Sequence, residues 1–197
     1  MGILINGYIK PRKIYLNNST VPKKVILNGI TIWTDTPSFL YSWGNQNNDY
    51  TGGWANCYPY GLYGGEWWNG TYVSSPDWGS DYVGFNMTGY PTVKTIITNK
   101  AIDFSSIKSL TFNGTGITNS QLQWVLALTN GNGGTVYKWV RASSKTTPGD
   151  HYVSGRDGTF TLDTSDFNGT ANVVVGANQT DVGGDSDIFL RSIIVNQ

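Results

Sequence analysis

From residue 39 onward the sequence consists of short β-prone runs separated by turn residues, and this spacing limits the folds open to the chain. No long stretch repeats apolar residues at helical spacing. Spacers such as residues 130–134 and 147–150 are rich in Gly, Asn and Pro, which favour turns. Seven or more strands at such intervals predict two packed antiparallel sheets rather than a parallel sheet with crossover helices. The predicted strands are residues 93–98, 107–113, 122–129, 135–141, 159–163, 171–176 and 187–195.

The last predicted strand breaks the alternation of buried and exposed positions. Its apolar residues Ile188 and Leu190 differ in parity from Ile193 and Val195. Either a β-bulge near Arg191 and Ser192 or a strand buried on both faces explains the change.

Five segments of this region resemble the jelly-roll modules of carbohydrate-binding type. They are Ala101-Ile102-Asp103-Phe104, Ile107-Lys108-Ser109-Leu110-Thr111-Phe112, Gly158-Thr159-Phe160-Thr161-Leu162-Asp163, Asn172-Val173-Val174-Val175 and Asp187-Ile188-Phe189-Leu190-Arg191-Ser192-Ile193-Ile194-Val195. The resemblance covers roughly residues 90–197, and it implies an all-β, antiparallel jelly-roll β-sandwich for residues 39–197. Jelly rolls of this group serve in glycan binding, in virion assembly and in capsid decoration, so the resemblance leaves those functions open.

The first 34 residues have a different character, because Asn6, Asn17 and Asn28 lie eleven residues apart, as do Pro11 and Pro22. Each unit places Asn-Gly or Asn-Asn between aliphatic runs, which is typical of tight hairpin turns. The clearest case is a hairpin of residues 24–27 and 30–33 around Asn28-Gly29. Short hairpins bury little surface alone, so this segment docks either onto the rest of the chain or onto another subunit. We favour another subunit, because the Pro-containing residues 34–38 resemble a linker.

Charge separates the two segments as well. Residues 1–34 carry five bases and no acid (+5), whereas residues 35–197 carry eight bases and thirteen acids (−5). Opposed charges suggest different partners for each segment, although lysines also protect exposed edge strands from unwanted pairing. The sequence of residues 23–33 resembles the beginnings of virion proteins, mostly tail components, of phages of Gram-positive bacteria. We therefore predict an assembly role for residues 1–34, carried by Lys10, Arg12, Lys13, Lys23, Lys24 and Trp33.

Residues 41–90 hold fourteen of the 27 aromatic residues, interleaved with Gly, Asn and Asp. Residues 52–70 are too irregular for one continuous strand, and we interpret them as long ordered loops, which are often functional. The C–H face of a pyranose ring lies flat on an aromatic ring, while Asn, Asp and Gln pair with the sugar hydroxyls. Large rings also pack cores and subunit interfaces, and the sequence does not sort them among these roles. The candidate glycan-binding residues are Trp54, Tyr58, Tyr60, Tyr63, Trp67, Trp68 and Trp78.

Side chains for catalysis are scarce. The chain has one histidine, His151, and one cysteine, Cys57, and it lacks a nucleophile-elbow pattern. Glycoside hydrolysis generally needs two carboxylates, for which Glu66 with Asp77 or Asp81 is the best candidate set. We therefore expect a binding or structural protein and not an enzyme.

Cofactors and membrane attachment are also not expected. Asp181, Asp185 and Asp187 offer oxygens for a structural calcium ion, which jelly-roll modules of the similar type often hold, but their spacing also suits ordinary Asp-Gly turns. No run approaches the roughly eighteen apolar residues of a membrane span. The first residues lack the basic-then-apolar order of a secretory signal.

These patterns lead to a functional hypothesis and one alternative. The hypothesis is a phage virion protein, of the tail, baseplate or capsid surface, that attaches by its N-terminus and displays a β-sandwich for host glycan adhesion. Its partners would be other virion proteins, further copies of itself and bacterial surface polysaccharide, with no nucleic acid or membrane, and its location would be the virion. The alternative is a free carbohydrate-binding module of an extracellular glycan-active enzyme.

Overall fold

The computed structural model describes residues 24–27, 30–34, 39–43, 50–69, 73–79, 83–87, 92–118, 122–143, 151–152, 157–179 and 186–197. The chain divides into two compact units, Met1–Pro37 and Ser38–Gln197. All regular elements in these ranges are β-strands, and the ranges contain no helix capable of crossing a membrane.

The first unit contains the predicted hairpin. Strands β1 (Lys24–Leu27) and β2 (Ile30–Thr34) pair antiparallel, with Leu27 opposite Ile30 and a register shift between Val25 and Ile26. The prediction of a hairpin around Asn28-Gly29 is therefore confirmed. The other repeat units lie outside the described residues, as do Lys10, Arg12, Lys13 and Lys23, and the side chains of Lys24 and Trp33 are not described.

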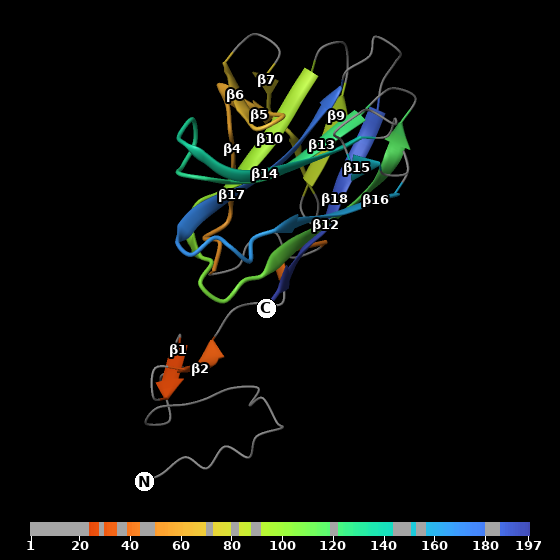
Figure 1. Ribbon diagram of the computed structural model, residues 1–197. Coiled ribbons are helices and arrows are strands. Elements are labelled where there is room, and N and C mark those ends of the chain that lie inside the picture. Colours follow the sequence, from red (N-terminus) through yellow and green to blue (C-terminus); the bar gives the residue numbers. More distant parts are fainter. Residues whose placement is uncertain are drawn as a thin grey trace. The chain divides into compact units, whose positions relative to one another are not determined.

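The second unit is an antiparallel β-sandwich of jelly-roll type, as the sequence predicts, and its strands lie in two layers (Figure 1). The larger sheet has eight strands in the order β15-β14-β13-β17-β10-β4, with β11 beside β17 and β7 beside β10. Its strands are β4 (Trp54–Asn56), β7 (Val73–Ser74), β10 (Thr92–Thr98), β11 (Ile102–Asp103), β13 (Leu122–Thr129), β14 (Val136–Ser143), β15 (His151–Tyr152) and β17 (Thr170–Gln179).

The smaller sheet of the sandwich has six strands in the order β16-β12-β18-β9-β8, with β3 beside β18. Its strands are β3 (Phe39–Ser42), β8 (Asp77–Trp78), β9 (Val83–Met87), β12 (Ser109–Thr118), β16 (Asp157–Asp163) and β18 (Ser186–Asn196). A separate hairpin consists of β5 (Tyr60–Tyr63) and β6 (Glu66–Asn69). All seven strands predicted from residue 93 onward are present, with bounds that differ by a few residues.

A β-bulge accounts for the broken alternation in β18. Asn113 of β12 lies opposite Ser192, whereas the next residue, Gly114, lies opposite Leu190, so Arg191 is the extra residue. The bulge lets both Leu190 and Ile193 point into the core. Of the two explanations that the sequence leaves open, the bulge is the one that the structure contains.

The main core lies between the two sheets. Phe85, Leu110 and Phe112 of the smaller sheet meet Leu126 and Val175 of the larger sheet, and all five are fully buried. Burying a side chain of this size contributes about 1.5–3 kcal/mol. The rings also contact one another, since Phe112 stacks on Phe160 and lies tilted against Trp124.

A second apolar cluster lies on the outer face of the larger sheet. Leu62 of the β5–β6 hairpin packs there with Ile97, Val125 and Val174, and the half-buried Trp67 packs against the same cluster. The interpretation of residues 52–70 as long loops is therefore wrong. They form three short strands, because the turn at Gly64-Gly65 folds the segment back and places its apolar side chains on the sheet.

Residues 73–78 pass from one sheet to the other. Val73 and Ser74 pair in parallel with Val93 and Lys94 of the larger sheet, whereas Trp78 pairs antiparallel with Val83 of the smaller sheet. Only Ser75 and Pro76 separate β7 from β8. This crossing segment therefore brings side chains of both layers together at one edge of the sandwich.

The single cysteine provides a test of the second cluster. Cys57 is fully buried, and burial raises the pKa of its thiol from 9.0 to about 12, against a smaller opposing effect from a hydrogen bond with Thr95. We expect iodoacetamide to leave Cys57 unmodified at pH 8 and to label it once the protein is unfolded, as measured by intact mass. Labelling of the native protein at the rate of a free thiol would contradict this burial.

The raised pKa also predicts an alkaline loss of stability. The folded protein retains the thiol proton between pH 9.0 and about 12, where the unfolded chain has lost it, so stability is complete below that window and falls through it. Urea unfolding of the wild type and of Cys57→Ala at a series of pH values measures this loss. The variant should lack the component that begins near pH 9.

Candidate functional site

The structure separates the seven aromatic candidates into three groups. Trp54 belongs to the main core, where its ring meets the Tyr41 ring edge-on at 6.4 Å. A ligand on the surface does not reach this ring, so the structure removes Trp54 from the predicted binding set. Its position follows from β4, which directs Trp54 inward and Ala55 toward the outer cluster.

Four candidates belong to the β5–β6 hairpin, and all four are partly buried: Tyr60, Tyr63, Trp67 and Trp68. The Trp67 indole N–H donates to the carbonyl oxygen of Gly134, which ties the hairpin to the loop before β14. The Tyr60 ring lies beside Gly133 of the same loop. Trp67 and Tyr60 thus attach the hairpin to the sheet, which is a packing role.

The remaining candidates, Tyr58 and Trp78, are the exposed ones. Tyr58 is 62% exposed and Trp78 is 40% exposed. Trp78 lies on β8, the edge strand of the smaller sheet, and Tyr58 follows β4 of the larger sheet by two residues. The structure therefore does not gather the seven predicted rings into one site.

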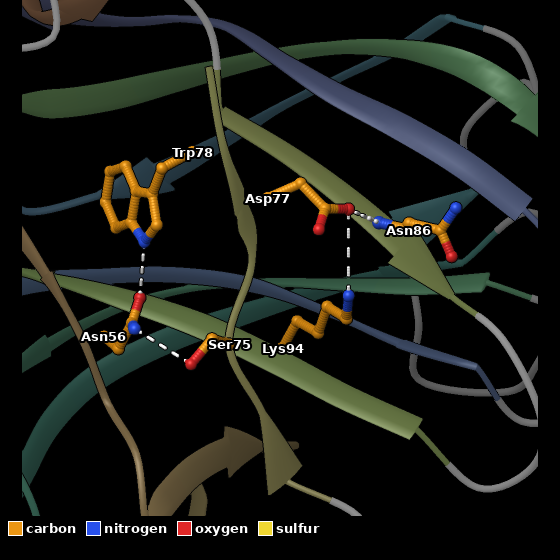
Figure 2. Close-up of polar contacts among 6 residues, drawn as sticks. All are labelled: Asn56, Ser75, Asp77, Trp78, Asn86 and Lys94. Carbon is orange, nitrogen blue, oxygen red and sulfur yellow. Dashed lines mark hydrogen bonds and ion pairs between the residues drawn. The ribbon is translucent and has the colours of Figure 1, made fainter. Parts of the chain in front are cut away.

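Hydrogen bonds fix the Trp78 ring at this edge (Figure 2). Its indole N–H donates to Asn56 Oδ1 at 2.7 Å, and Asn56 Nδ2 in turn donates to Ser75 Oγ at 2.9 Å. Asn56 comes from the larger sheet and Trp78 from the smaller one. The indole is thus oriented by a bond that joins the two layers, and a large part of its surface remains in solvent.

An ion pair joins the layers beside this chain of hydrogen bonds. Lys94 Nζ of β10 lies 3.9 Å from Asp77 Oδ2 of β8, with the lysine side chain 10% exposed and the aspartate side chain 55% exposed. The same carboxylate oxygen accepts a hydrogen bond from the backbone N–H of Asn86 at 3.3 Å. Figure 2 shows all three groups, and both contacts drawn for the Asp77 carboxylate end on the same oxygen, Oδ2.

We name the surface of Asn56, Ser75, Asp77 and Trp78 the edge site. It combines an oriented indole with an amide, a hydroxyl and a carboxylate oxygen. Flat apolar surface beside hydrogen-bonding groups is suited to binding a polar ring-shaped ligand, and none of these groups forms a nucleophile–base pair.

The sequence pattern identifies Trp78 and Tyr58, but it misses Asn56, Ser75 and Lys94. These three become neighbours of β8 only because the crossing segment brings both sheets to one edge. The pattern also misses four exposed aromatic residues of the described ranges that lie outside the candidate set, which are Phe39, Trp43, Tyr137 and Trp139.

The other polar candidates remain dispersed. Glu66 lies on the β5–β6 hairpin and Asp77 lies on the smaller sheet, whereas Asp81 is outside the described residues. Within the described ranges, no three His, Cys, Asp or Glu side chains gather as a metal site. Asp181 and Asp185 lie outside those ranges, and the side chains of Asp187 and His151 are not described, so the calcium site stays a prediction.

Comparisons with known proteins give structural likenesses alone. No protein-family model matches the sequence, and none of the curated proteins matches it. The carbohydrate-binding module TmCBM61, solved with β-1,4-galactotriose, is 11% identical over 61% of this chain and 72% of its own, with a TM-score of 0.38. A non-crystalline cellulose specific module, CBM28, is 17% identical over 60% of this chain and 76% of its own, with a TM-score of 0.40. The mannan-recognising module TmCBM27 is 14% identical over 59% of this chain and 73% of its own, with a TM-score of 0.37.

The ion pair between Asp77 and Lys94 predicts that replacing either residue has a different effect on the stability of the fold. Asp77→Asn leaves the buried Lys94 ammonium without its anion, so we expect a loss of about 1 kcal/mol, since the exposure of Asp77 already weakens the pair. Lys94→Met retains the buried aliphatic stem and leaves Asp77 in water, so we expect a change within about 0.5 kcal/mol. Urea unfolding measures both, and equal losses in the two variants would contradict the assigned burial.

Proposed function

We propose that the chain is a glycan-binding protein and that the edge site holds the sugar. The observation that carries this proposal is Trp78, an indole 40% exposed whose N–H is already bonded to Asn56. A pyranose ring that stacks on this indole competes with no hydrogen bond of the ring. The ring therefore offers an apolar platform of fixed orientation.

Polar groups around the platform support a sugar over a purely apolar ligand. Both contacts of the Asp77 carboxylate fall on Oδ2, so its Oδ1 can accept from a ligand. The Ser75 hydroxyl retains a hydrogen to donate while it accepts from Asn56. Sugar hydroxyls both donate and accept, so they pair with either group. The phenol of Tyr58 adds a second exposed ring two residues beyond Asn56.

Rigidity also favours this use of the edge site. Asn56 and Lys94 lie on hydrogen-bonded strands of the larger sheet, and Asp77 and Trp78 lie on a strand paired to β9. Side chains held on paired strands lose little freedom when a ligand binds, which limits the entropic cost of binding.

The first unit gives the proposal its context. Residues 1–34 carry five bases and no acid, against a net charge of −5 for residues 35–197, which supports a role in attachment to a different partner. We propose that this segment anchors the chain to a phage particle, so that many copies present the edge site to a bacterial surface and gain avidity. The alternative is a free carbohydrate-binding module of an extracellular glycan-active enzyme, and neither function needs catalysis by this chain.

Trp78→Ala tests glycan binding, and the chain offers a matched control. Trp43 has nearly the same exposure, 41%, but lies after β3, where the Arg191 guanidinium stacks on it. On a panel of bacterial wall polysaccharides we expect Trp78→Ala to weaken binding at least about tenfold, a loss of about 1.4 kcal/mol, and Trp43→Ala to leave it unchanged. Affinity electrophoresis measures both, and equal losses would contradict an edge site.

A second experiment separates the two contexts. Replacing Lys10, Arg12, Lys13, Lys23 and Lys24 together by Gln removes the basic charge of the first unit without shortening the chain. A particle component should lose co-sedimentation with virions and keep its binding of polysaccharide. A wild-type chain that stays monomeric and never sediments with particles would support the free module instead.

A further inference from the structure

The β5–β6 hairpin and strand β14 together hold an arginine against two aromatic rings. The Arg141 guanidinium carbon lies 5.7 Å from the centre of the Tyr63 ring and 6.0 Å from that of the Trp139 ring. Arg141 and Trp139 are two residues apart on β14, so they share one face of the strand, and Tyr63 comes from the hairpin. No candidate from the sequence pattern other than Tyr63 belongs to this cluster, which we name the arginine site.

The turn of the hairpin is shaped to fit this site. Gly64 and Gly65 both have positive φ, 57° and 86°, and they join Tyr63 directly to its partner Glu66. A Cβ on Gly64 would lie 3.0 Å from Arg141 Nη1, and one on Gly65 would lie 2.3 Å from Trp139 Nε1. The turn thus allows the hairpin backbone to lie against the arginine and the indole, which fixes both side chains.

The chemistry of the cluster indicates an anion. A guanidinium that lies over aromatic rings directs its N–H donors in its own plane, where a pair of them matches the geometry of a carboxylate or phosphate. Trp139 remains 44% exposed, which provides flat apolar surface beside that charge. A saccharide with a negative group fits both features, because its ring stacks on the indole while its anion reaches the arginine.

We propose that the arginine site binds an acidic saccharide, that is, a glycan bearing carboxylate or phosphate groups. This site is separate from the edge site, and its residues lie on β14 and the β5–β6 hairpin. Glu66 is exposed and lies directly opposite Tyr63, so its charge opposes such a ligand. Salt weakens this binding, because the attraction between exposed charges is screened.

The test uses the full chain and three polymers: polygalacturonate, its fully methyl-esterified form and polyglycerol phosphate. The ester retains the sugar backbone and lacks the charge, so we expect it to bind at least about tenfold more weakly than polygalacturonate. Binding of polyglycerol phosphate in place of polygalacturonate would assign the anion as phosphate and support the same site. Absence of binding to both anionic polymers, equal binding of the ester, or equal binding of poly-glutamate would overturn the proposal.

Variants locate the binding within the molecule. Arg141→Lys keeps the charge but loses the planar fork, and Arg141→Gln loses both, so we expect progressive losses of affinity. Arg191→Gln is the matched control, because Arg191 also stacks on a tryptophan, Trp43, at 4.8 Å. A loss in Arg191→Gln equal to that in Arg141→Gln would overturn the assignment.

Two further variants separate this proposal from folding defects and from the edge site. Glu66→Gln should tighten binding of the anionic polymer, a gain that misfolding does not produce. Trp43→Ala, which lies outside both sites, should leave that binding unchanged. The edge-site proposal fails separately, if Trp78→Ala leaves the binding of neutral glycans unchanged. If Glu66→Gln has no effect and Arg141→Gln has none, the arginine site does not bind anions.

Discussion

Two neighbouring inner strands of the larger sheet, β10 and β17, are covered on both faces, and the two candidate sites depend on this double coverage. On the inner face, Ile96 and Val175 pack into the sandwich core, and on the outer face, Ile97 and Val174 pack under the β5–β6 hairpin. Since each face of a sheet presents alternate residues, this pair of strands needs apolar residues at consecutive positions. Contact with the outer face of the sheet also stabilises the β5–β6 hairpin, because an isolated two-stranded hairpin is marginally stable in water.

Each candidate site forms where another segment of the chain packs against this sheet. At one edge, residues 73–78 leave β10 and join β9, so that Asn56 and Lys94 of one layer meet Trp78 and Asp77 of the other. On the outer face, the Gly64-Gly65 turn of the covering hairpin reaches Trp139 and Arg141 of β14. In both places an exposed tryptophan is fixed by a contact between different elements. The two surfaces differ in charge chemistry, with a carboxylate in the edge site and a guanidinium in the arginine site.

Much of the sandwich could be predicted from the sequence, because strand formation leaves a local signal. The seven strands from residue 93 onward and the irregularity at Arg191 follow from the pattern of apolar residues and turn residues. The hairpin at Lys24–Leu27 and Ile30–Thr34 follows from Asn-Gly between aliphatic runs. The short strands between residues 54 and 78 could not be predicted, since two to four residues are too few to establish a period.

The sequence by itself determined that the described ranges form strands and no long helix, where most of those strands lie, and that aromatic residues concentrate in residues 41–90. These properties depend on near neighbours along the chain. Only the tertiary structure decided that Trp54 is core, that Trp67 ties a hairpin down, and that Trp78 is presented to solvent. The physical reason is that the exposure of a ring is set by the elements that pack over it, and here those elements come from distant parts of the sequence.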